Sequence, residues 1–259
     1  MDLELAERTA IVTGGSKGIG LAVVRALAGS GAHVIAGAKQ PSAELDELAK
    51  SEQVRFVEVD LAAPSGPAAL IAQAGDRVDI LVNNVGGAPA RPGGFLSITD
   101  DDWLATINLD LMATIRACRS VLPAMLAANS GVIITICSVN ARLPDPAVLD
   151  YSTAKAGLAA FCKALSKEVG PAGIRVNTVS PGPVATDLWL GAEGVAQTVS
   201  AATGTDPDDV ARQAASQMVT GRFTQPSEVA DLVLFLASSR AGNITGADFT
   251  IDGGLVPTW

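Results

Sequence analysis

Short runs of β-branched and other apolar residues alternate along the chain with longer stretches of helical character. The apolar runs are nearly continuous, as is typical of parallel strands that are buried on both faces. They predict strands at Thr9–Thr13, His33–Ala36, Val54–Val59, Asp79–Val82, Val132–Ile136, Arg175–Val179 and Asp248–Ile251. The intervening segments predict helices at Gly18–Ala28, Ser42–Lys50, Ser65–Ala74, Asp101–Ala128, Tyr151–Val169 and Ser227–Ala237.

This alternation predicts an α/β fold, an open, doubly wound parallel sheet of about seven strands with helices on both faces. No linker rich in Pro, Gly or Ser divides the chain, so residues 1–259 are expected to form a single domain. Segment 186–224 has weak periodicity and a short helical patch. Because ligands bind beyond the carboxyl ends of such strands, it is a candidate substrate lid, with an ordinary surface excursion as the alternative.

Composition narrows the class of protein. The net charge is −9 and no cluster of Lys and Arg occurs, which argues against nucleic-acid binding and against a polybasic membrane anchor. A hydrophobic content of 48% and a mean hydropathy of +0.34 argue against disorder. The acidic N-terminus, Met1–Leu5, has no apolar core of a signal peptide, so a cytoplasmic protein is expected.

The single histidine and the three cysteines exclude further chemistry. His33 lies in an apolar run that predicts a strand, which argues against a Ser-His-Asp triad. Cys118, Cys137 and Cys162 are far apart, so no metal site is expected, and buried free thiols in a reducing compartment are the simpler interpretation.

A glycine-rich loop follows the first predicted strand. It reads Thr13-Gly14-Gly15-Ser16-Lys17-Gly18-Ile19-Gly20 and leads into a helix. Glycines allow a tight turn and let backbone N–H groups approach a pyrophosphate at the start of the helix. The Gly-x3-Gly-x-Gly spacing differs from the common Gly-x-Gly-x2-Gly dinucleotide fingerprint. The loop predicts a dinucleotide site, with a glycine-rich turn that binds nothing as the alternative.

Further motifs follow this loop in order along the chain. They are Asp60, Asn83-Asn84-Val85-Gly86, Asn108, Ser138, Tyr151-x3-Lys155, and Pro181-Gly182 with Thr186. Together with Thr-Gly-x3-Gly-x-Gly, this set resembles the short-chain dehydrogenase/reductase family over essentially the whole chain, and is similar to the 3-oxoacyl-(acyl-carrier-protein) reductases. The resemblance implies a Rossmann-type fold and an NAD(P)-dependent enzyme that acts on CH–OH or C=O groups. Val85 is the one departure, since the family usually has alanine there.

The resemblance also implies a catalytic set of Asn108, Ser138, Tyr151 and Lys155. Tyr151 and Lys155 are four residues apart on a predicted helix, so their side chains share a face, and a nearby ammonium favours the tyrosinate. Tyr151 would be the acid and base, Ser138 would hydrogen-bond the carbonyl oxygen, and Asn108 would anchor a water linked to Lys155. Tyr151 is the only tyrosine of the chain, which argues against a mere packing role.

Charge at the end of the second strand bears on the choice of cofactor. Ala38 and Lys39 stand where NAD-preferring members carry an acidic residue, so Lys17 and Lys39 imply a preference for NADP(H) over NAD(H); two solvated lysines are the alternative. Asp60 resembles the residue that holds the adenine amino group. The expected cofactor-binding residues are Gly14, Ser16, Lys17, Gly18, Ile19, Gly20, Lys39, Asp60, Leu61, Asn84, Gly86, Tyr151, Lys155, Pro181, Gly182, Val184 and Thr186.

These features favour an NADPH-dependent reductase of a ketone, such as a 3-oxoacyl thioester, a polyketide-like ketone or another hydrophobic ketone. The alternatives are an NAD-linked alcohol or polyol dehydrogenase and a catalytically silent NADPH-binding protein. Arg91 and Arg142 lie in loops that contact substrate in the family and could bind an anion, although a solvated arginine is the simpler interpretation of each. The helices at 101–128 and 151–169 resemble those that pair family members into a homotetramer.

Overall fold

The computed structural model describes residues 3–192 and 194–258. Its strands form one parallel sheet in the order β3-β2-β1-β4-β5-β6-β7. The first three strands are added toward one edge of the sheet, and the chain then crosses to β4, beside β1, and adds the rest toward the other edge. All seven predicted strands are confirmed, with small changes at their ends. They are β1 (Thr9–Thr13), β2 (His33–Ala38), β3 (Val54–Glu58), β4 (Ile80–Asn83), β5 (Gly131–Ile136), β6 (Ile174–Pro181) and β7 (Asp248–Ile251).

The predicted helices are confirmed, with one interruption. A π-helical turn at Asn108–Met112 separates α4 from α5, where a single helix is predicted. The helices are α1 (Gly18–Gly29), α2 (Ala43–Leu48), α3 (Gly66–Ile71), α4 (Asp100–Ile107), α5 (Ala113–Ala128), α6 (Leu149–Val169), α7 (Asp187–Leu190), α8 (Val195–Thr203), α9 (Pro207–Ser216) and α10 (Pro226–Ala237).

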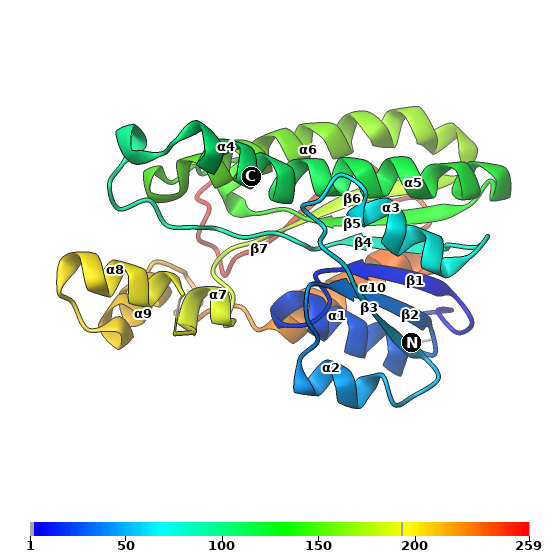
Figure 1. Ribbon diagram of the computed structural model, residues 1–259, viewed down its shortest axis with the longest axis horizontal. Coiled ribbons are helices and arrows are strands. Elements are labelled where there is room, and N and C mark those ends of the chain that lie inside the picture. Colours follow the sequence, from blue (N-terminus) through cyan, green and yellow to red (C-terminus); the bar gives the residue numbers. More distant parts are fainter. Residues whose placement is uncertain (1–2, 193, 259) are drawn as a thin grey trace.

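Side chains that alternate along the strands divide the core into two layers. Ala10 and Val12 of β1 pack with α1 and α10, whereas Ile11 packs on the opposite face with α3, α5 and α6. Figure 1 shows this arrangement, with α5 and α6 above the sheet and α1 and α10 below it. The three cysteines are buried and free, as predicted.

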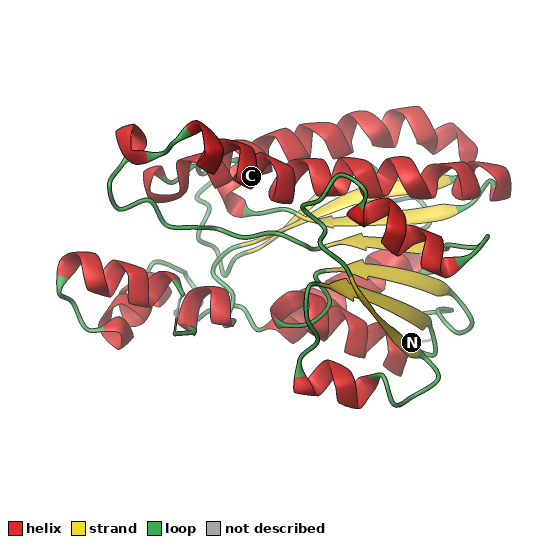
Figure 2. Cartoon of the chain, in the orientation of Figure 1, coloured by secondary structure: helices red, strands yellow, loops and turns green. Residues whose placement is uncertain are grey.

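Segment 186–224 leaves the sheet beyond the carboxyl ends of the strands (Figure 2). It contains three helices, α7, α8 and α9, where only a short helical patch is predicted. A parallel bridge between Val184 and Thr224 joins its two ends, and the rings of Trp189 and Phe223 meet edge to face at 5.3 Å. The segment is therefore a helical insertion whose two ends are held together by these contacts, next to the carboxyl edge of the sheet.

The continuous stretch Asp100–Ala128 is the one described helix whose length and hydropathy would let it cross a membrane. Core helices of globular proteins pass the same test. Here the stretch lies along the sheet, and its residues Ala117, Val121 and Met125 are buried in the core.

Candidate active site

The glycine loop turns closely around the end of β1. Gly14 and Gly18 have positive φ angles of 67° and 55°, which favour glycine. A Cβ on Gly20 would lie 2.1 Å from the Gly14 carbonyl oxygen, so no larger residue fits there. Lys17 is exposed at the start of α1. The loop thus presents backbone N–H groups at a helix N-terminus, which is the arrangement that holds a pyrophosphate.

Asn84, which directly follows β4, stabilises this loop by hydrogen bonds. Its side-chain amide donates to the carbonyl oxygens of Thr13 and Gly14, at 3.1 and 3.0 Å. The Thr13 hydroxyl accepts in return from the backbone N–H groups of Asn84 and Val85, at 2.9 and 3.1 Å. Asn84, expected at the cofactor, therefore ties the end of β4 to the loop.

A cavity of about 670 Å³ lies beside the loop. Of the expected cofactor residues, Gly14, Lys39, Asp60 and Leu61 line it. Lys39 Nζ lies 3.1 Å from Asp60 Oδ2, and both side chains are largely exposed. The Ala62 backbone N–H, together with Lys39, lowers the pKa of Asp60. A cation and an anion therefore face each other at the carboxyl ends of β2 and β3.

The remaining expected cofactor residues frame the site from β6 and from the α1 start. Pro181 ends β6, and the Gly182 N–H donates to the Ile251 carbonyl oxygen at 3.0 Å. Thr186 directly precedes α7 and lies close to Gly18: a Cβ added at Gly18 would be 3.3 Å from the Thr186 methyl group. The insertion therefore starts against the glycine loop.

Ser138, Tyr151 and Lys155 meet at the ends of β5 and α6. Lys155 is almost fully buried, donates to the Ile136 carbonyl oxygen at 3.3 Å, and lies 5.4 Å from the centre of the Tyr151 ring. Ser138 is also buried, and its hydroxyl exchanges hydrogen bonds with Asn140 at 3.1 Å. A hydroxyl donor, a phenol and an ammonium thus share one corner of the site.

The Lys155 ammonium favours the tyrosinate, as expected, but burial acts in the opposite direction on the pKa of Tyr151. Burial raises the pKa of Tyr151, and this effect outweighs the opposing influence of the Lys155 ammonium and the Ser138 hydroxyl. Burial lowers the pKa of Lys155, but the charges of Tyr151 and Asp110 outweigh it and raise that pKa overall. Tyr151 is therefore a protonated phenol at neutral pH in this structure.

Asn108, which the resemblance places at a water linked to Lys155, lies in the π-helical turn between α4 and α5. Its side-chain oxygen accepts from Arg116 at 3.0 Å, and the residue lines the cavity near Asp60. Asp110 of the same turn contacts Lys155, with Oδ1 3.5 Å from Lys155 Nζ. The reason is the π-helical turn, which widens the helix and changes which residue faces the sheet. A lone carboxylate between Leu109 and Leu111 is the sequence signal that could have shown it.

Both arginines of the expected substrate loops are paired with carboxylates, and only Arg142 is largely exposed. Arg91 donates to Asp150 and Asp102, and Arg142 Nη2 lies 2.9 Å from Asp248 Oδ2. Asp150, which sequence reasoning missed, is fully buried. Both guanidinium groups already hold a carboxylate, so neither presents an unpaired charge to an anionic substrate.

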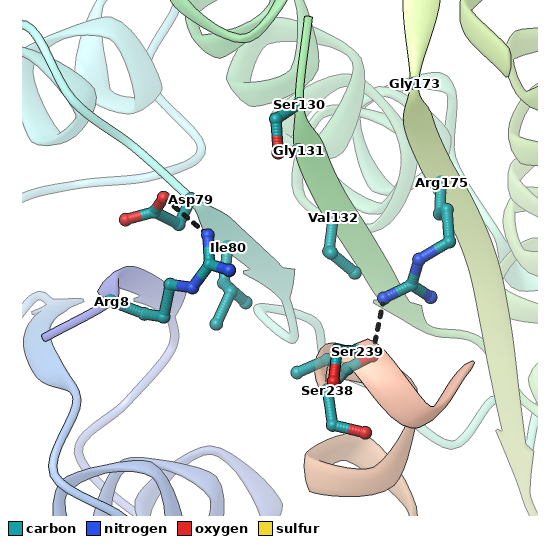
Figure 3. A pocket seen from close by; sticks show the side chains of 11 residues that line it. Arg8, Asp79, Ile80, Ser130, Gly131, Val132, Gly173, Arg175, Ser238 and Ser239 are labelled. Carbon is teal, nitrogen blue, oxygen red and sulfur yellow. Dashed lines mark hydrogen bonds and ion pairs between the residues drawn. The ribbon is translucent and has the colours of Figure 1, made fainter. Parts of the chain in front are cut away.

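A second, smaller cavity of about 140 Å³ lies at the opposite edge of the sheet, where the strands begin (Figure 3). Arg8 pairs there with Asp79 at 3.2 Å, and Arg175 donates to the carbonyl oxygens of Leu236 and Ser238. These groups tie strand starts to the end of α10. The cavity is therefore remote from Tyr151, and its charged groups have partners within the protein.

The residues at the larger cavity fit a dinucleotide. Gly14 lines this cavity, and the close packing at Gly20 holds the glycine loop against the start of α1. Asp60 and Lys39, which line the cavity, offer an acceptor and a cation. The hydride-exchanging ring would then lie toward the Tyr151 corner.

Residues 14–256 match the family model described as enoyl-(acyl carrier protein) reductase. A 3-oxoacyl-(acyl-carrier-protein) reductase FabG of Chlamydia trachomatis is 34% identical, over 97% of this chain and 98% of that protein. The crystal structure of L-sorbose reductase from Gluconobacter frateurii, complexed with NADPH and L-sorbose, has a TM-score of 0.91 and 33% identity and covers 100% of both chains. A putative NAD(P)-dependent gluconate 5-dehydrogenase from Beutenbergia cavernae with bound NADP has a TM-score of 0.88 and 31% identity, again over 100% of both chains.

The family match covers nearly the whole chain, and relatives above 30% identity cover almost all of it. The fold agrees with that of the solved relatives. The protein is an NAD(P)-dependent oxidoreductase of CH–OH and C=O groups and belongs to the short-chain dehydrogenase/reductase family.

Proposed function

We propose that this protein is an NADPH-dependent reductase that converts a ketone to a secondary alcohol, reversibly, with Tyr151 as the acid and base. The observation that carries the proposal is the meeting of Ser138, Tyr151 and Lys155 at the carboxyl edge of the sheet, next to the glycine loop. In a doubly wound sheet this edge is where ligands bind.

Each side chain has a part in the proposed reaction. A bound nicotinamide would supply the hydride. Ser138 donates to the carbonyl oxygen and stabilises the negative charge that develops on it. The Tyr151 O–H bond breaks as its proton passes to that oxygen, and the phenolate that remains is stabilised by the Lys155 ammonium. Lys155 also orients the nicotinamide ribose in the proposed complex.

The preference for NADPH rests on charge at the cavity. Lys17 and Lys39 are exposed at the starts of α1 and of the loop after β2, and no acidic side chain ends β2. Asp60 now holds Lys39, so a 2′-phosphate would compete with that carboxylate for the ammonium. An NAD-linked alcohol or polyol dehydrogenase is the alternative.

The substrate is a neutral, largely apolar ketone in this proposal. Arg91 and Arg142 are paired, and Leu143, Leu188 and Leu190 of the substrate loops and of α7 are exposed. Apolar side chains are typical of the walls of a small-molecule site. The segment 186–224 acts as the substrate lid.

We also propose a cytoplasmic homo-oligomer, a tetramer by resemblance to the family. The most apolar window of Asp100–Ala128 is only 33% buried within this chain, and Leu104 and Leu126 are exposed along it. A second copy of the chain would cover this surface.

The first test is NADPH consumption with a short 3-oxoacyl thioester, beside a panel of bulky and cyclic ketones and a keto sugar. Turnover of the thioester supports reduction of acyl chains, and turnover of a bulky ketone alone makes the lid the specificity element. Tyr151→Phe should abolish turnover with every substrate, yet leave NADPH binding nearly intact. A Tyr151→Phe enzyme that turns over at a comparable rate would falsify the role of this residue.

A further inference from the structure

A buried carboxyl group stands behind the catalytic pair. Asp110 is 1% exposed, and its Oδ1 lies 3.5 Å from Lys155 Nζ. The Gly87 backbone N–H donates to both of its oxygens, at 3.2 and 3.4 Å. An ammonium and a peptide N–H are suitable partners of an ionised carboxylate, and they offset part of the cost of burying its charge.

The chain packs tightly around this carboxyl group. A Cβ on Gly86 would lie 2.5 Å from Asp110 Oδ1 and 3.3 Å from Lys155 Nζ. The π-helical turn directs Asp110 inward, and β4 delivers Gly86 and Gly87 against it. The Asp110 carboxylate and the Tyr151 ring therefore both lie close to the Lys155 ammonium.

We propose that Asp110 is a positioning residue for proton transfer: its carboxylate takes up part of the charge of Lys155, so that Tyr151 keeps its proton and the site stays loaded for carbonyl reduction. This inference rests on the proposed role of Tyr151 as the acid. It concerns a charged group of this chain outside the expected catalytic set of Asn108, Ser138, Tyr151 and Lys155.

The neighbouring charges are consistent with this arrangement. Burial raises the pKa of Asp110 to about 6, against the opposing influence of Lys155 and of the Gly87 N–H, while Asp150 of α6 raises it further. The Asp110 charge raises the pKa of both Lys155 and Tyr151, and the Cys137 thiol at the end of β5 adds to both effects. Above about pH 6 the ionised carboxylate thus opposes formation of the tyrosinate.

The consequence differs between the two directions of the reaction. In reduction, Tyr151 gives its proton to the alkoxide oxygen, and a phenol that remains protonated to higher pH serves over a wider range. In oxidation, the phenolate must first form in order to take the hydroxyl proton of the alcohol. Oxidation therefore needs a higher pH in this protein than it would with a neutral residue at position 110.

The experiment uses the fact that Tyr151 is the only tyrosine. The near-ultraviolet absorbance of tyrosinate, followed against pH on the cofactor-free protein, reports this side chain alone, and Tyr151→Phe provides the blank. We expect Asp110→Asn to move the midpoint to lower pH and Asp110→Glu to leave it nearer that of the unmutated protein. Asp101→Asn is the matched control, because it removes the same charge from an exposed position of α4.

A second measurement needs no substitution at position 110. The Cζ carbon signal of labelled Tyr151 in the unmutated protein should show a step near pH 6, as Asp110 ionises. An unmoved or raised midpoint in a folded Asp110→Asn protein, or no step in the carbon signal, overturns the inference. Neither measurement involves turnover, so failure of the proposed ketone reduction would show separately, as absence of NADPH consumption.

Discussion

Arg91 fastens the loop that follows β4 to the first turn of α6, through Asp150. Its Nη2 and Nε lie 2.6 and 3.2 Å from Asp150 Oδ2, and Thr106 donates to the same oxygen at 2.7 Å. Asp150 is fully buried and precedes Tyr151 directly in the chain. Burial raises the pKa of Asp150, but Arg91 and Thr106 outweigh it and lower that pKa overall. The ion pair thus helps to hold the turn that carries the acid.

Arg91→Ala should therefore cost both stability and turnover. It leaves a buried carboxylate without its cation, which typically costs about 3–5 kcal/mol. Urea unfolding should show this loss, and kcat should fall because the first turn of α6 is no longer held. The double variant Arg91→Met with Asp150→Leu should recover much of the stability.

Arg142→Ala is the matched control for this prediction. Arg142 is also paired with a carboxylate, Asp248, but its side chain is 53% exposed. Exposed ion pairs contribute roughly 0–1 kcal/mol. If Arg142→Ala lowered the free energy of unfolding as much as Arg91→Ala does, the distinction between the buried and the exposed ion pair would be contradicted.

Asp110 should give a second, pH-dependent effect on stability. Its pKa is raised from 3.8 to about 6 in the folded protein, so the folded state holds a proton that the unfolded state has released. The contribution of Asp110 to the free energy of unfolding is therefore largest below about pH 4 and is lost as the pH rises through about 6. The free energy of unfolding of the unmutated protein, relative to Asp110→Asn, should fall by about 2 kcal/mol between pH 4 and 7. A difference that stays constant, or rises, over this window would mean that Lys155 outweighs burial.

Lys39 should discriminate between the cofactors. Lys39→Ala removes a charge-assisted contact to a 2′-phosphate, which is worth about 1.5–3 kcal/mol, or roughly tenfold to hundredfold in the Kd for NADPH. The Kd for NADH should change much less, and Lys39→Asp should favour NADH. Fluorescence titration with both cofactors measures this.

Lys50→Ala serves as the control for Lys39. Lys50 is an equally exposed lysine just beyond α2 and pairs with Glu47. It should leave both Kd values unchanged. If Lys39→Ala weakened the binding of NADPH and NADH equally, Lys39 would not contact the 2′-phosphate.

Two glycines of the same helix should respond in opposite ways to alanine. Gly20→Ala places a methyl group 2.1 Å from the Gly14 carbonyl oxygen, so the loop must distort and cofactor affinity should be lost. Gly29→Ala meets nothing within 4 Å and ends α1 in an ordinary backbone conformation. It should raise the stability by about 0.4–1 kcal/mol with unchanged affinity. Thermal unfolding and NADPH titration of both variants check this pair.

The sheet and its helices could be predicted from the sequence because their signals are local. Runs such as Ile80–Val82 are apolar at every position, which is typical of a strand covered on both faces, and the helical spacing between the runs separates them. The glycine loop and the Tyr151-x3-Lys155 spacing are local as well, and the structure brings both to one edge of the sheet.

The sequence by itself therefore determined the fold, the family and the phenol–ammonium pair of this protein. Only the tertiary structure decided that Asp110 contacts Lys155, and that Arg91 holds Asp150. Both depend on contacts between residues that are distant in the chain, 45 residues apart in the first pair and 59 in the second. A helical period cannot reveal a π-helical turn, and a charged residue does not show in the sequence whether its partner is water or a buried ion.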